Sequence, residues 1–276
     1  MGKYFTLEVK PKITASQQAA NSGVYADGDV VFDWQAIDIP KGANRLVGAT
    51  AVIRQKHGTA GNEQPFILLY AKTLNGTAPG SLGTSNATAN GTGFYNNVIG
   101  KSSFLAKDYI GDKIDNGVVL ASLQQGGADS EQPSQVLQCE PDSGTNVGYD
   151  KLYVGMIAEG AFDFSTSVDL DDAVDISGND GTIDDLDGTA CNLVFTPGDV
   201  IHAQDDIIVG EVASVTADAI TFKFNGQATA SGTDYSVPTT LANWRIQNGA
   251  DAAGDLANND ELFNLSPVTI LLSFER

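Results

Sequence analysis

The sequence predicts an all-β protein, namely a jelly-roll-like β-sandwich with a small SH3-like or OB-like β-barrel inserted into it. Three observations support this fold class. The chain opens on a strand pattern at 4–9 and closes on another at 267–275. Between them, no sustained run of apolar residues has helical spacing. The 30 glycines suit a fold with many tight turns.

The first half of the sandwich is predicted to contain four strands. Within the second of them, Val30, Phe32 and Trp34 alternate and are expected to share one face, which places Trp34 in the core. The third strand contains a glycine that suits a β-bulge. The four strands cover 4–9, 30–34, 45–54 and 65–71.

A long uncharged loop at 75–93 separates these strands from the next three. It is rich in Gly, Asn and Thr, and loops of this length are typically binding loops, lattice contacts or disordered segments. The three strands that follow are predicted at 117–123, 134–139 and 151–158.

The last third of the chain contains an acidic segment and then a second unit. Eight aspartates lie between positions 169 and 187, which predicts an acidic linker or loop over 169–190. Short strands joined by tight turns predict the small inserted barrel over 191–240. The closing strand is expected to return to the sandwich. That domain is then discontinuous and consists of residues 1–168 plus 241–276.

The net charge of −20 is distributed unevenly. Residues 1–113 carry eleven Lys and Arg against eight Asp and Glu, whereas residues 114–276 carry four against twenty-seven. An acidic surface of this density repels nucleic acid and anionic lipid. No stretch approaches the ~20 apolar residues of a membrane span. We therefore expect a soluble protein that binds neither nucleic acid nor a membrane.

The acidic segment is the candidate cation site. Calcium takes several carboxylate and carbonyl oxygens from flexible loops. The spacing does not fit an EF-hand, and a solvated acidic loop is the alternative. No other cofactor is expected. The candidate ligands are Asp171, Asp172, Asp175, Asp180 and Asp184.

Cysteine and histidine show no transition-metal pattern. Cys139 and Cys191 are the only cysteines, and His57 and His202 the only histidines. No pair among them has the short spacing that zinc-binding loops use. We expect both cysteines to be buried free thiols, while a disulfide between them stays open.

Catalytic motifs are also absent from the sequence. We find no nucleophile elbow, P-loop or dinucleotide fingerprint, and we expect no enzymatic activity. A carbohydrate-binding adhesin is an alternative of a different class. It would expose an aromatic or ion-dependent sugar site at a loop tip, with 75–93 and 169–187 as the candidates.

Four segments resemble the virion structural proteins of tailed phages, particularly those of marine cyanophages. They are 28–34, 40–48, 198–222 and 259–270. The resemblance is one of general style over most of the chain. It implies a capsid decoration or cement protein that binds the major capsid protein lattice or other virion proteins. It also implies assembly in the host cytoplasm, location in the virion and a homo-oligomer, with a trimer favoured.

Two expectations accompany this resemblance. On the charge distribution, residues 1–113 should contribute more of the particle contact than residues 190–240. A tail or baseplate component, or a carbohydrate-binding adhesin of a phage, is the alternative function.

Overall fold

The computed structural model confirms the all-β class. It describes residues 3–54, 63–91, 93–110, 118–124, 134–141, 148–164, 168–170, 175–177, 180–184, 186–187, 192, 195–203, 208–216, 219–223 and 261–276. Within this part of the chain, strands in three antiparallel sheets dominate, and helices are short. None of the described helices is long and apolar enough to cross a membrane.

One sheet of the sandwich has six strands and contains both ends of the described chain. The closing strand β18 lies between the opening strand β1 and the long strand β3, so the prediction that it returns to the sandwich is confirmed. β3 also pairs with β8 near its beginning and with β7 near its end. The strands are β1 (Tyr4–Val9), β18 (Val268–Glu275), β3 (Ala43–Arg54), β7 (Val118–Gln124), β6 (Tyr109–Ile110) and β8 (Gln135–Gln138).

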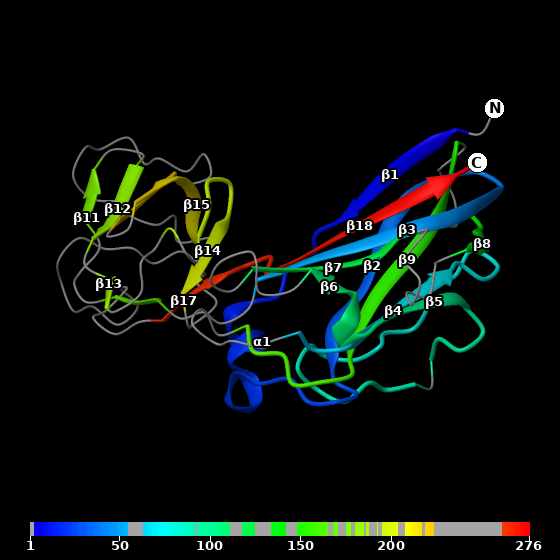
Figure 1. The fold of residues 1–276 in the computed structure, drawn as a ribbon, viewed down its shortest axis with the longest axis horizontal. Helices are drawn as coiled ribbons and strands as arrows, with labels where there is room; N and C mark the ends of the chain where they lie inside the picture. The colour runs from blue at the N-terminus through cyan, green and yellow to red at the C-terminus, as the bar shows by residue number, and fades with distance from the viewer. Residues whose placement is uncertain are drawn as a thin grey trace.

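The second sheet has four strands in the order β2, β9, β4, β5. They are β2 (Val30–Pro40), β9 (Tyr149–Ala158), β4 (Phe66–Lys72) and β5 (Val98–Phe104). Every pairing in both sheets is antiparallel, which suits the period-two alternation of buried and exposed residues in β18. Figure 1 shows the long strands of the two sheets stacked over each other.

The predicted alternation of β2 is wrong. The register of β2 against β9 shifts between Val30 and Phe32 and again between Phe32 and Gln35. Each β-bulge inserts a residue and changes which side the following side chains face. As a result, Phe32 lies in the main core, whereas Val30 and Trp34 pack on the opposite side of the sheet.

The main core lies between the two sheets. Phe66 and Phe104 stack with ring centroids 4.4 Å apart, and Phe162 meets Phe66 edge-on at 6.0 Å. From the other sheet, Ile270 and Leu272 of β18 are fully buried in the same cluster. Burial of this apolar surface is the dominant force that holds the sheets together.

The helices with described bounds are short and lie between strands. Thr14 caps the first of them, because its hydroxyl accepts a hydrogen bond from the Gln17 backbone N–H while the Gln17 side chain accepts one from the Thr14 N–H. The helices are α1 (Ala15–Ala19), η1 (Ala20–Gly23) and η2 (Ala106–Asp108).

A third sheet of eight strands lies beside the sandwich, and β17 leads from it into β18 (Figure 1). Its order is β11, β12, β16, β15, β14, β17, β10, β13. The strands are β10 (Val168–Leu170), β11 (Asp175–Ser177), β12 (Asp180–Asp184), β13 (Leu186–Asp187), β14 (Val200–Ala203), β15 (Ile208–Val215), β16 (Ala219–Lys223) and β17 (Glu261–Asn264).

Strands from the acidic segment join strands from 191–240 in this third sheet. β12 pairs with β16, and β17 pairs with both β14 and β10. The domain boundaries, the inserted barrel and the jelly-roll topology stay predictions.

Candidate functional site

The outer face of the six-stranded sheet carries small hydroxyl and aliphatic side chains. We call this surface the hydroxyl face. Its side chains alternate with buried core residues and are half-buried or exposed. Its aliphatic members belong to neither hydrophobic cluster that the described residues of the sandwich form. The hydroxyl face consists of Thr6, Gly48, Thr50, Val52, Leu120, Ser122, Thr269, Leu271 and Ser273.

The hydroxyl groups on this face hydrogen-bond across strands. The Thr50 and Ser122 hydroxyl oxygens are 3.0 Å apart, and those of Thr6 and Ser273 are 3.4 Å apart. A hydroxyl that already has a partner loses less free energy when another surface covers it. Covering these paired hydroxyls would therefore cost less free energy than covering unpaired ones.

Among the described residues, the charged side chains on this side of the sheet lie around the rim of the hydroxyl face, with Glu8 at its lateral edge on β1. At one end, a row of four residues runs across the sheet in the order Tyr4, Glu275, Arg45, Val136. Glu275 accepts a hydrogen bond of 2.9 Å from the Tyr4 hydroxyl and lies 3.5 Å from Arg45. Tyr4 and Val136 are 71% and 63% exposed, which makes this rim apolar as well as charged.

The opposite end of the face meets the segment before β14. Arg54 pairs with the carboxylate of Asp199 and donates a hydrogen bond of 2.8 Å to the Thr196 hydroxyl. Asp199 also accepts from the Thr196 backbone N–H at 2.8 Å. This ion pair joins the end of β3 to the segment that leads into β14.

The outer face of the four-stranded sheet is covered by the chain itself. The loop predicted at 75–93 places Leu82 on this face, where it packs with Val30 and Phe94 and with the partly buried Trp34. The Trp34 indole N–H donates a hydrogen bond of 2.8 Å to the Gly80 carbonyl. Trp34 therefore belongs to a small second core, in accordance with its predicted core role, although on the other side of the sheet.

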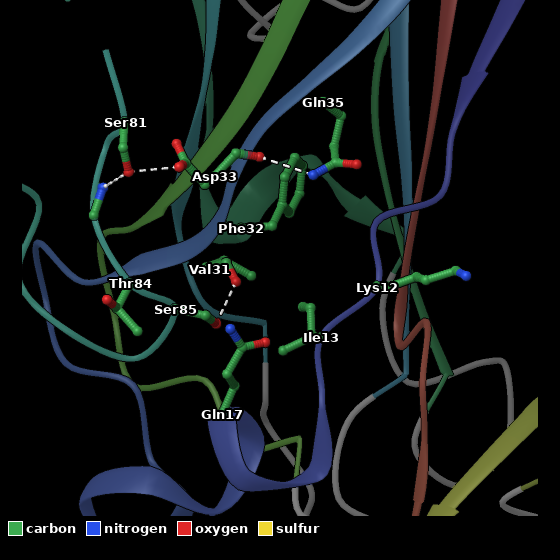
Figure 2. Close-up of a pocket in the computed structure, with 11 residues that line it drawn as sticks. Lys12, Ile13, Gln17, Val31, Phe32, Asp33, Gln35, Ser81, Thr84 and Ser85 are labelled. Atoms are coloured by element: carbon green, nitrogen blue, oxygen red, sulfur yellow. Dashed lines mark hydrogen bonds between the residues drawn. The ribbon is translucent and has the colours of Figure 1, made fainter. Parts of the chain in front are cut away.

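A pocket of about 400 Å³ opens where this loop, β2 and the segment before α1 meet (Figure 2). Its wall combines apolar side chains from the main core with uncharged polar groups, one lysine and one carboxylate. The lining residues are Lys12, Ile13, Gln17, Val31, Phe32, Asp33, Gln35, Ser81, Gly83, Thr84 and Ser85.

Asp33 holds the loop against β2 at the edge of the pocket. One carboxylate oxygen accepts hydrogen bonds of 2.8 Å from the backbone N–H groups of Trp34 and Leu82, and the other accepts one of 2.5 Å from the Ser81 hydroxyl. Deeper in the pocket, the Ser85 hydroxyl donates to the Val31 carbonyl at 2.7 Å. An aspartate within an otherwise apolar strand is the sequence signal that points to this anchor.

The shifted pKa values of the described groups arise from burial or from hydrogen bonds between side chains, such as the bond to Glu275 that raises the pKa of Tyr4. Burial raises the pKa of the Cys139 thiol to about 12 and raises the pKa values of the Tyr25 and Tyr70 hydroxyls. The hydrogen bond from Lys72 lowers the pKa of Glu140. Cys139 is a buried free thiol, as predicted. Cys191 lies outside the described residues.

The candidate calcium ligands are only partly described. Asp175 lies in β11, opposite Thr182, while Asp180 and Asp184 lie in β12, opposite Lys223 and Ala219 of β16. Asp171 and Asp172 lie outside the described residues. Within the described ranges, no three His, Cys, Asp or Glu side chains are grouped so that they could hold a metal ion. Calcium binding stays a prediction.

Comparison with known proteins adds no relative: no protein-family model, no curated protein and no solved structure matches this chain.

Proposed function

We propose that this chain is a non-enzymatic virion structural protein that decorates a capsid and binds the major capsid protein lattice through the hydroxyl face. The observation that carries the proposal is the contrast between the two outer faces of the sandwich. One is covered by a loop with its own core, and the other presents aliphatic groups and paired hydroxyls.

The charge of the hydroxyl face supports docking on another protein. The chain carries −20 overall, but around the hydroxyl face Glu275 is paired with Arg45 and Asp199 with Arg54, which leaves the charge of Glu8. Such a face meets a protein lattice with less repulsion than the rest of the acidic chain produces. It also combines an uncharged centre with a polar rim, which is typical of protein interfaces.

The test is a binding assay on particles. Ser122→Lys places a charge on the hydroxyl face, next to Thr50, and we expect it to reduce the amount of protein that cosediments with purified capsids at least tenfold. The matched control is Ser103→Lys, at a half-buried outward position on β5 of the other sheet, and it should leave cosedimentation unchanged.

Two outcomes would contradict the proposal. Equal binding of both lysine variants would exclude the hydroxyl face as the docking surface. Immunogold labelling of intact particles supplies the second check. Label over the head supports decoration, whereas label confined to the tail, or absent from particles, contradicts it.

The polar pocket favours a second candidate function, the binding of a neutral saccharide by an adhesin. Pockets of about 300–1,000 Å³ are the usual size of small-molecule sites. One lysine and one carboxylate balance the charge of the lining, and its remaining polar groups are amides and hydroxyls. Part of the wall comes from 75–93, one of the two loops in which the sequence places a sugar site.

Thr84 is suited to a test of this second function, because it is exposed and lines the pocket. A glycan array should show binding by the unmodified chain. The double change Gln35→Ala with Thr84→Val should then weaken that binding at least tenfold. Absence of any glycan signal, or binding that the double change does not alter, would remove the pocket from consideration.

A further inference from the structure

β1 is an edge strand with one side of its backbone unused by the described chain. Lys3 and Arg276 exchange two backbone hydrogen bonds, of 3.1 and 2.9 Å. In an antiparallel ladder, hydrogen-bonded and non-hydrogen-bonded pairs alternate. The N–H and C=O groups of Tyr4, Thr6 and Glu8 therefore point away from β18. An exposed row of this kind is a template for another strand.

The inward side chains of β1 are also only partly covered. Phe5 and Leu7 face the core side of the sheet, and Phe5 stacks on Phe274 with ring centroids 5.3 Å apart. Both remain only partly buried, unlike their neighbours in β18. The core therefore continues to the edge of the sheet, and none of the described strands closes it there.

We propose that a second copy of this chain closes this edge by antiparallel pairing of β1 with β1, with Thr6 on the two-fold axis. Tyr4 then lies opposite Glu8 of the second copy, and Phe5 lies opposite Leu7. Polar outer residues meet polar outer residues, and apolar inner residues meet apolar inner residues. An interface between two copies about a two-fold axis requires a surface that is complementary to itself, and the edge of β1 meets this requirement.

The register follows from the outward backbone groups. The outward N–H and C=O groups belong to Tyr4, Thr6 and Glu8, so they can bond only if these residues lie opposite the same set in the second copy. The possible registers therefore differ by steps of two residues. Centring on Phe5 leaves Glu8 without a described partner, and centring on Leu7 pairs Tyr4 with Lys10, beyond the end of β1. Centring on Thr6 pairs the strand over its whole length and places no like charges opposite each other.

This pairing also extends the surface described above. In-plane antiparallel pairing about a two-fold axis keeps the hydroxyl faces of both copies on the same side of one continuous sheet. The pairing does not rest on the proposed function, because it needs no capsid. Its failure and the failure of capsid binding are therefore distinguishable.

Thr6→Pro tests the pairing directly. Proline removes the outward N–H of Thr6, which makes no bond to β18, so the fold is retained while two central intermolecular hydrogen bonds are lost. The unmodified chain should elute as a dimer with twice the 28.8 kDa monomer mass in light scattering, and Thr6→Pro as a monomer. Thr6→Val, which also removes the hydroxyl but keeps the N–H, should stay dimeric.

Cysteine crosslinking tests the register. In the proposed dimer the two Thr6 Cα atoms are about 5.5 Å apart, within the range that a disulfide spans. Thr6→Cys should form a covalent dimer on mild oxidation. Glu8→Cys should not, because the two Glu8 positions lie more than about 13 Å apart. A monomeric or trimeric unmodified chain, or crosslinking at Glu8 in place of Thr6, would overturn the proposal.

Discussion

The two outer faces of the sandwich differ in how far the rest of the chain covers them. On the four-stranded sheet, Leu82 from the long loop and Phe94 just after it pack against Trp34 and form a second, smaller core. On the six-stranded sheet, the outward residues are small, and their hydroxyls bond to one another. The difference teaches that the loop at 75–93 is a structural cover for one face, while no described segment covers the other face in the same way.

A matched pair of leucine truncations should separate the two faces by the largest margin. Leu82 is fully buried in the cover, and we expect Leu82→Ala to lower the free energy of unfolding by about 2–5 kcal/mol. Leu271 on the hydroxyl face is half-buried, so Leu271→Ala should cost about 0.5–1 kcal/mol. Urea denaturation measures both values, and equal losses would mean that the faces are equally covered.

The two faces can also be compared by adding a side chain at a glycine on each sheet, namely Gly155 and Gly48. A Cβ at Gly155 would overlap Leu82 and lie 3.1 Å from the Trp34 ring, whereas a Cβ at Gly48 meets only ordinary contacts, the nearest at 3.5 Å. We expect Gly155→Val to destabilise by about 1–3 kcal/mol. Gly48→Val should change stability by less than about 0.5 kcal/mol. Thermal unfolding of the two variants checks this, and a tolerated Gly155→Val would show that the loop does not press on β9.

The carboxylate that anchors the cover should have a smaller effect. Asp33→Asn keeps one acceptor oxygen for the backbone N–H groups but presents an amide N–H₂ to the Ser81 hydroxyl. We expect a loss of about 1 kcal/mol. Hydrogen exchange should rise locally at Ser81 and Leu82 and stay unchanged on the hydroxyl face. Exchange that rises equally on both faces would indicate a global effect.

Alkaline pH should lower the free energy of unfolding through ionisation of the buried Tyr25. Tyr25 lies under the loop, with its hydroxyl 2.8 Å from that of Ser85, and burial raises its pKa. A raised pKa in the folded state means that the unfolded chain loses its proton first. The stability due to this group is therefore complete below pH ~10 and declines as pH rises beyond that value. Urea midpoints measured from pH 8 to pH 11 should fall. Tyr25→Phe should reduce the slope, and an unchanged slope would contradict this assignment.

The sequence alone determined the strand content of this protein. Period-two alternation and turn residues depend on neighbours in the chain, so strands such as β3, β4 and β9 lie close to their predicted ranges. The buried Cys139 and the return of the closing strand into the sandwich were also readable in this way.

Only the tertiary structure decided which face each strand presents and what covers it. The two β-bulges in β2 depend on pairing with β9, more than a hundred residues away, and they reversed the expected side of Trp34 relative to Phe32. The loop at 75–93 has no strand-like pattern. Its role depends on the Leu82 side chain, which occupies the space that the missing side chain of Gly155 leaves open. Contacts between distant segments are fixed by packing, which no local pattern encodes.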